Sequence, residues 1–151
     1  MRRTCIAACC LFFLWFGSAC FGQAFTVRVL NWNNAHPVPK LRVSVMLDYG
    51  NPPSRSTTLD SETDTNGEAH FALSDPVPSS FRCTVYYDWR RWKGSGMYGA
   101  NGTIDDLIQK GILAHYSEKS PRMVKPKPGE IVFMIRPWSF CGRILARLMS
   151  P

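Results

Sequence analysis

An alternation of apolar and polar residues with a period of two recurs in several short segments and limits the folds open to this chain. The clearest example covers residues 41–48, where every second residue is a leucine or a valine. Successive side chains of a strand point to opposite faces, so this pattern is typical of a strand with one buried face. Residues 25–31, 68–73 and 81–90 show the same alternation and are bounded by turn-forming residues.

A turn motif, Thr63-Asp64-Thr65-Asn66-Gly67, immediately precedes the predicted strand 68–73. An aspartate carboxylate can accept hydrogen bonds from backbone N–H groups two residues further on, and Asn-Gly supplies positions that tolerate positive φ. We therefore assign Asp64, Asn66 and Gly67 to a structural turn. The polar stretch 54–60 before it suits a sheet edge or a loop.

The segments after residue 90 are more varied. After Glu130, the segment 130–135 has apolar residues on both faces, as expected for a central strand. A threonine followed by two acidic residues predicts a short helix near 103–111, which a glycine ends. Glycines at 94, 96 and 99 predict a flexible loop around Met97 and Tyr98, and residues 119–129 read as a basic, proline-rich linker.

Several short strands separated by turns, with at most two short helices, predict an all-β sandwich. The total of 151 residues leaves room for one domain, which we place at 25–137. About seven strands suit this length.

Residues 1–24 have the three parts of a secretory signal peptide. Arg2 and Arg3 precede an apolar run over 6–16, and small residues end at Ala24. We expect a secreted or periplasmic protein. Two alternatives stay open. The sequence before Cys20 loosely resembles a lipoprotein cleavage box, although a glycine stands where a large aliphatic residue is usual, and residues 5–21 sit at the short edge of what spans a bilayer.

Removal of the leader would take away four of the six cysteines and leave Cys83 and Cys141. In an exported protein these two can form a single disulfide. Two buried reduced thiols are the equal alternative. With no third cysteine and no histidine pair at ligand spacing, we expect no metal site and no cofactor.

The same cleavage lowers the basic residues from 18 to 16 against 11 acidic ones, a net charge of +5. The partners of a basic exported surface are more often anionic polymers, lipid head groups or cell wall than nucleic acid, which we do not expect as a partner. A solvated face that keeps the protein soluble is the simpler interpretation.

An opening strand, Pro37-Val38-Pro39, Val43-x-Val45 and the Thr63-Asp64-x-Asn66-Gly67-x-x-x-Phe71 element together resemble the carboxypeptidase regulatory-like domain. The resemblance covers roughly residues 25–87. It implies an immunoglobulin-like, transthyretin-like β-sandwich, similar also to collagen-adhesin B-type repeats, in a small exported bacterial protein. Such domains are generally non-catalytic accessories. The internal Lys–Asn bond of some adhesin relatives is not expected, because Arg28 stands where the lysine would be.

No residue pattern predicts catalysis. The histidines lack metal-ligand spacing, no Gly-x-Ser-x-Gly element is present, and the acidic pairs have simpler roles as turn and helix caps. We predict no enzymatic activity and no catalytic residues. A small extracellular hydrolase acting on a polysaccharide or cell-wall polymer is the competing hypothesis.

Aromatic and basic residues gather around the end of the strand 81–90. Exposed aromatic and cationic side chains are typical of carbohydrate or protein contacts. The candidate binding surface comprises Tyr86, Trp89, Arg90, Arg91, Trp92, Lys93 and Tyr98. In the alternative, the tryptophans cover the open end of the core.

Residues 138–151 form an amphipathic tail whose apolar residues are spaced along one side of a candidate helix, with Arg143 and Arg147 nearby. Such a tail can rest on a membrane surface or dock on its own domain. The sequence thus predicts a non-catalytic exported binding or structural module for a protein or polysaccharide, with membrane attachment through the tail as an alternative.

Overall fold

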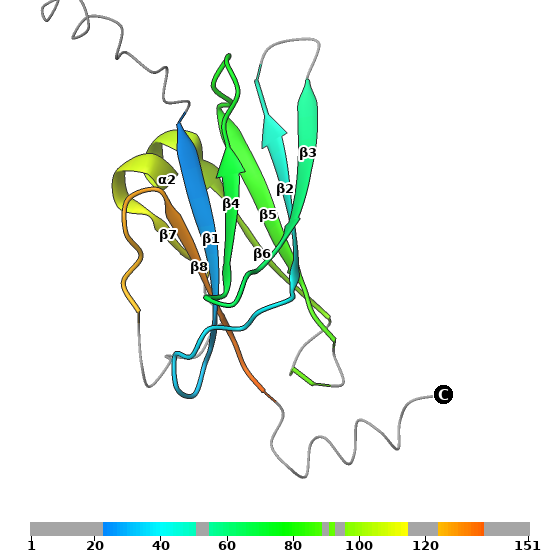
Figure 1. The fold of residues 1–151 in the computed structure, drawn as a ribbon. Helices are drawn as coiled ribbons and strands as arrows, with labels where there is room; N and C mark the ends of the chain where they lie inside the picture. Colours follow the sequence, from blue (N-terminus) through cyan, green and yellow to red (C-terminus); the bar gives the residue numbers. More distant parts are fainter. Residues whose placement is uncertain (1–22, 51–54, 89–90, 93–95, 115–123, 138–151) are drawn as a thin grey trace, which may run out of the picture.

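Two four-stranded sheets pack face to face in the computed structural model, which describes residues 23–50, 55–88, 91–92, 96–114 and 124–137 (Figure 1). The all-β sandwich that the sequence predicts is confirmed. The described elements are β1 (Ala24–Asn31), β2 (Arg42–Asp48), β3 (Ser56–Glu62), β4 (Glu68–Ala72), β5 (Ser80–Tyr86), β6 (Met97–Thr103), α2 (Ile104–Lys110), β7 (Ile112–Ala114) and β8 (Glu130–Ile135).

The two sheets differ in strand direction. One has the order β3-β2-β5-β6, and every neighbouring pair in it is antiparallel. The other has the order β4-β1-β8-β7, in which β1 is antiparallel to β4 but parallel to β8, and β7 is also parallel to β8. The valines of β2 point between the sheets and are fully buried, as the period of two predicts.

The strand β8 is central in its sheet and buried at every position, as its sequence predicts. Ile131, Phe133 and Ile135 join the main core between the sheets. Val132 and Met134 point to the other face, where they form a second apolar cluster with Leu30 and Trp32. A strand covered on both faces has no position for an exposed polar residue, which explains its unbroken apolar run.

A partly buried ion pair lies on this outer face of the sheet near the start of β8. Arg28 Nε lies 2.7 Å from Glu130 Oε1, and Glu130 Oε2 accepts a 2.8 Å hydrogen bond from the Lys127 backbone N–H. Glu130 is 7% exposed. One carboxylate oxygen therefore has a cationic partner and the other has a backbone donor, which compensates the buried charge.

The predicted loop around Met97 and Tyr98 is wrong, because these residues begin β6. The strand pairs with β5 along its whole length, from Tyr86↔Met97 to Ser80↔Thr103. Its inward positions, Tyr98 and Ala100, pack against the main core. Glycine weakens a strand but does not prevent one where neighbouring hydrogen bonds and core contacts favour it.

Three smaller differences concern strand limits. β3 is an edge strand over a stretch for which the sequence allowed edge or loop. β7 has three residues, too few for a visible period, and was not predicted. β5 ends at Tyr86, whereas the predicted strand continued to residue 90.

The short helix predicted near 103–111 is confirmed as α2. Thr103 caps it, since its Oγ1 accepts a hydrogen bond from the Asp106 N–H at 3.2 Å. Gly111 ends it with φ +70° and donates its N–H to the Leu107 carbonyl. Ile104 and Leu107 are buried in the core at the end of the sandwich opposite the β1–β2 loop (Figure 1).

The predicted signal peptide up to residue 22, the linker residues 119–123 and the tail 138–151 lie outside the described residues. None of the helices described is long and apolar enough to cross a membrane.

Candidate binding site at the loop end of the sandwich

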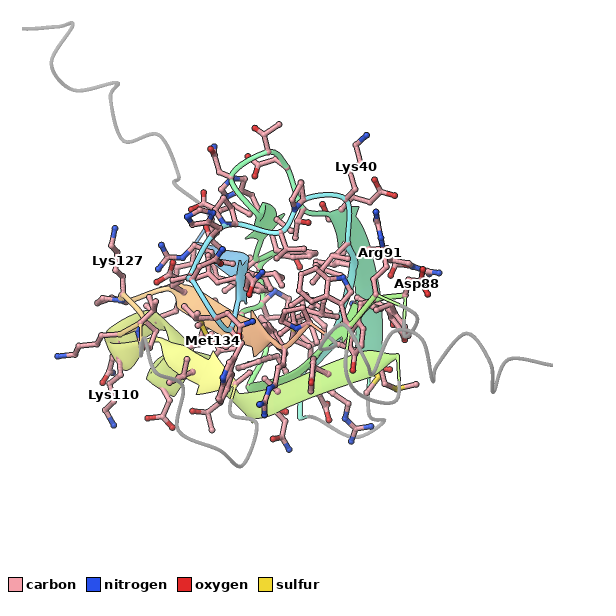
Figure 2. All side chains as sticks on the ribbon, turned by 90° about the horizontal axis from the view of Figure 1, so that it is seen from below. Lys40, Asp88, Arg91, Lys110, Lys127 and Met134 are labelled. Atoms are coloured by element: carbon pink, nitrogen blue, oxygen red, sulfur yellow. The ribbon has the colours of Figure 1, made fainter. Side chains whose placement is uncertain are left out.

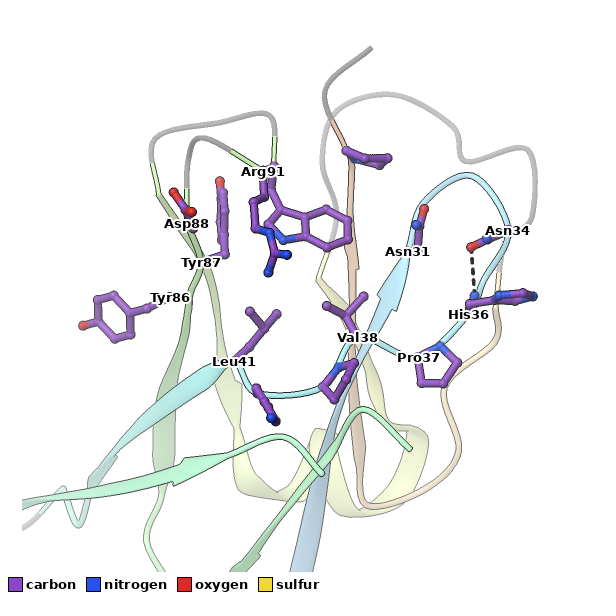
Figure 3. Close-up of a pocket in the computed structure, with 14 residues that line it drawn as sticks. Asn31, Asn34, His36, Pro37, Val38, Leu41, Tyr86, Tyr87, Asp88 and Arg91 are labelled. Carbon is purple, nitrogen blue, oxygen red and sulfur yellow. Dashed lines mark hydrogen bonds between the residues drawn. The ribbon is translucent and has the colours of Figure 1, made fainter. Parts of the chain in front are cut away.

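An open depression of about 1390 Å³ lies at one end of the sandwich (Figure 3). Three segments form its walls: the β1–β2 loop at 32–41, the described residues 87–88 and 91–92 that follow β5, and Pro137 after β8. We call this region the loop end. β1 and β2 belong to different sheets, so their connection has to cross the open end of the core there.

The first half of the β1–β2 loop is held by its own short-range hydrogen bonds. The Asn31 N–H donates to the His36 carbonyl, and the Ala35 N–H donates to the Asn31 carbonyl, both at 2.8 Å. Asn34 Oδ1 accepts from the His36 N–H at 3.1 Å. Asparagine side chains commonly form such local bonds, so the asparagine-rich sequence fixes the loop's shape.

Thr63 holds the second half of the loop. Its Oγ1 donates a 2.9 Å hydrogen bond to the Val38 carbonyl and accepts a 3.0 Å bond from the Leu41 N–H. Its backbone carbonyl accepts from the Lys40 N–H at 2.8 Å. Thr63 is 3% exposed, so these bonds lie away from water. They hold Lys40 in a left-handed conformation with φ +61°.

The turn that follows Thr63 has the aspartate geometry that the sequence predicts. Asp64 Oδ1 accepts hydrogen bonds from the N–H groups of Asn66 (2.8 Å) and Glu68 (2.9 Å). The bond from Glu68, with a smaller contribution from Asn66, holds the pKa of the Asp64 carboxyl below its ordinary value of 3.8. Gly67 has φ +72°, but Asn66 does not share this conformation, which corrects that part of the prediction.

The same turn packs closely against the β1–β2 loop. A Cβ atom on Gly67 would lie 2.6 Å from the Val29 carbonyl oxygen and 2.9 Å from the Val38 nitrogen. The turn and the loop that lines the depression are therefore in direct backbone contact.

The opposite wall follows β5. The Arg91 and Trp92 N–H groups donate to the Asp88 carbonyl at 2.9 and 3.1 Å, which forms a short turn. Trp92 also makes an isolated bridge with Pro137 and packs, half-buried, against the main core. Figure 3 shows the Arg91 side chain directed into the space above Val38 and Leu41.

The structure divides the predicted binding surface. Arg91 and Trp92 line the depression. Tyr98 stacks on Tyr87 with ring centroids 5.0 Å apart and is half-buried. Tyr86 borders the depression, but its ring points away from it in Figure 3, and Arg42 lies 5.7 Å above that ring. Trp89, Arg90 and Lys93 lie outside the described residues.

Sequence reasoning missed the wall formed by the β1–β2 loop, which includes Asn34, His36, Val38 and Lys40. No local sequence signal identifies this wall, because its place depends on the strand order. β2 pairs antiparallel with β5 so that Arg42 lies opposite Tyr86. The residues before β2 therefore face the residues after β5, whatever their separation in sequence.

Two cations, Lys40 and Arg91, border the depression. Lys40 and Arg91 are exposed, and neither side chain forms an ion pair or hydrogen bond in the part of the chain that the structure describes. Asp88 is the acidic residue among the described lining residues. In Figure 2, Lys40, Asp88 and Arg91 lie on one side of the molecule, with Lys110 and Lys127 across from them.

The ionisable groups elsewhere form no reactive centre that the described residues complete. Among these residues, no three histidine, cysteine or acidic side chains come together as metal ligands. Cys83 is a free thiol, fully buried, and its burial raises its pKa to about 12. This thiol is protonated and inert at neutral pH. Cys141, the other member of the predicted disulfide, lies outside the described residues.

No family model, no curated protein and no solved structure matches this chain. The resemblance to the carboxypeptidase regulatory-like domain therefore stays a prediction.

Proposed function

We propose that this protein is a non-catalytic, exported binding module that holds a segment of an extracellular or envelope polysaccharide at the loop end. The half-buried indole of Trp92 in the wall of the depression carries the proposal. One part of this ring packs on the core, and the rest faces an open cavity bordered by polar side chains.

This combination suits a sugar better than a protein surface. A pyranose presents an apolar C–H face, which can stack on an aromatic ring, and a rim of hydroxyl groups, which need hydrogen-bonding partners. Asn31, Asp88 and Arg91 line the same depression as the indole and have polar groups of that kind. Ligand sites commonly combine an apolar surface with a few placed polar groups.

The fold suits a binding role. The β1–β2 loop is anchored by Thr63 and by its own hydrogen bonds, so its wall of the depression is formed before a ligand arrives. A preformed site loses less conformational entropy on binding. We also propose that the sandwich is of the immunoglobulin-like, carboxypeptidase regulatory-like type, because its Thr-Asp-x-Asn-Gly turn supports the loop end.

The test is a polysaccharide-binding panel run with the purified protein, together with an assay for released reducing ends. We expect retention by at least one polysaccharide and no hydrolysis. Trp92→Ala should weaken binding by about tenfold or more, since ring contacts of this kind dominate binding sites. Tyr86→Ala, which removes an exposed ring pointing away from the depression, is the matched control and should bind as the wild type does.

Circular dichroism and thermal unfolding show whether each variant remains folded, because Trp92 also contacts the core. Arg91→Ala is a second variant that removes no core contact. Hydrolysis of any polymer, or undiminished binding by folded variants of both Trp92 and Arg91, would refute the proposal.

A further inference from the structure

We infer that the sugar held at the loop end carries an acidic group, a carboxylate or a phosphate, that binds between Lys40 and Arg91. This inference rests on the proposed function and names the chemical class of its ligand. It follows from the charges around the depression and from the way in which the backbone presents them.

The two cations come from opposite walls. Lys40 belongs to the β1–β2 loop, and Arg91 belongs to the turn after β5. An anion between them would contact both walls at once. A guanidinium group can donate two parallel hydrogen bonds to a carboxylate or phosphate, and an ammonium group adds a compact charge.

Some cations of the described residues are paired with acids and others are not, and Lys40 and Arg91 are the unpaired lysine and arginine that line the depression. Arg28 pairs with Glu130, Arg42 with Asp60, and Lys110 with Asp106. Lys40 and Arg91 have no such partner in the described part of the chain. Unpaired cations at a concave surface attract anions, because the low-dielectric walls concentrate the field.

The backbone holds Lys40 in place at some energetic cost. Its φ of +61° is unfavourable for a residue with a Cβ atom, and the hydrogen bond to the Thr63 carbonyl maintains this conformation. Glycine would suit the same position without strain. A lysine at this point therefore places a positive charge at the rim where the fold alone favours glycine.

The sequence adds charge of the same sign nearby. Arg90 and Lys93 flank the described pair Arg91 and Trp92 along the chain. The overall formal charge is +7 and remains +5 without the predicted leader.

The central comparison of the test uses two polymers that differ in charge but share a backbone. Polygalacturonate carries a carboxylate on each sugar, and its methyl ester is neutral. A glycerol-phosphate polymer tests phosphate, and vesicles of phosphatidylglycerol test whether a lipid phosphate serves instead. Binding of wild-type protein is measured at low and high salt, with Lys40→Gln, Arg91→Gln and Lys110→Gln as variants.

We expect the acidic polymers to bind and the methyl ester to bind at least tenfold more weakly. Lys40→Gln and Arg91→Gln should each reduce affinity for the acidic polymer by about tenfold, as expected for a close charge pair. Lys110→Gln removes the same charge at the opposite end and should change affinity less than twofold. High salt should weaken binding.

The outcomes separate the two proposals. Equal, Trp92-dependent binding of the neutral and acidic polymers would overturn the inference and leave the proposed function standing. Binding of vesicles alone, unchanged by either rim variant, would overturn both. Failure to retain any polysaccharide, charged or neutral, would also remove the proposed function.

Discussion

The backbone N–H of Lys40 donates a 2.8 Å hydrogen bond to the carbonyl oxygen of Thr63. Thr63 opens the turn that is the most recognisable motif of the sequence, and Lys40 lies on the rim of the loop end. The motif therefore does more than reverse the chain into β4. It also supports the wall of the candidate site, because Thr63 joins the turn to the β1–β2 loop through hydrogen bonds.

Replacement of Thr63 by valine tests this support. Valine matches the shape of threonine but leaves the Val38 carbonyl and the Leu41 N–H without their buried partner. We expect the free energy of unfolding, measured by urea denaturation, to fall by about 2 kcal/mol. Polysaccharide binding should weaken as the loop shifts. Thr63→Ser keeps the hydroxyl and should retain most of both, whereas equal loss in the two variants would show that the hydroxyl does not matter.

Two glycines offer a matched pair of alanine substitutions. Gly67→Ala places a Cβ atom against two backbone atoms in a left-handed residue, and we expect it to lower the free energy of unfolding by roughly 2 kcal/mol or more. Gly99 lies on the exposed face of β6, where a Cβ would meet only the Cys83 carbonyl at 3.8 Å. Gly99→Ala should raise stability by about 0.5–1 kcal/mol. Thermal unfolding measures both, and a similar loss in the two variants would contradict the difference in packing.

The lowered pKa of Asp64 predicts a pH dependence. Because folding lowers this pKa from 3.8, the ionised carboxylate favours the folded state, and its contribution is present above that pH. The contribution is lost as the pH falls through the folded-state pKa. Asp64→Asn should therefore lower the unfolding temperature at neutral pH, and the gap from wild type should close in acid. A gap that stays constant down to about pH 2 would show that the carboxylate charge is not the cause.

Lys40→Gly should separate stability from binding. Glycine relieves the strain of the positive φ, so we expect the free energy of unfolding to rise by roughly 0.5–1 kcal/mol, after the greater freedom of the unfolded chain is taken into account. Binding of the acidic polymer should fall, because the rim loses its charge. Ala35, with φ +57° in the same loop, gives the control. Ala35→Gly should be stabilised to a similar degree and bind normally, and a loss of binding there would point to loop shape rather than charge.

The strands that the sequence predicts best are those whose pattern is local. In β2 and β5 the inward residues are apolar and most outward residues are polar. The period of two within each segment is therefore enough to identify the strand. In β6 the inward Tyr98 and Ala100 are separated by Gly99, and local propensity there favours a loop. Pairing with β5 overrides that propensity. Such pairing between separate segments cannot be predicted from the sequence of either segment alone.

For the same reason, only one wall of the candidate site could be predicted from the sequence. Arg91 and Trp92 were found from their chemistry, but the parity of the strand places neighbouring Tyr86 on the outer face of the sheet. The place of Lys40 and of the rest of the β1–β2 loop wall depends on how β2 and β5 align across the sheet. That alignment, rather than any motif near residue 40, brings the two cations to one cavity.

Mapping of the bound polymer onto the protein tests the central claim most directly. Backbone amide chemical shifts are followed by NMR while fragments of the retained polysaccharide are added to the protein. We predict that the shifts that change cluster at 31–41 and 87–92, with little change at Arg82 and Met97 on the outer face of the β3-β2-β5-β6 sheet. Changes concentrated on that outer face, with the loop end unaffected, would contradict the claim that this protein binds its ligand at the loop end.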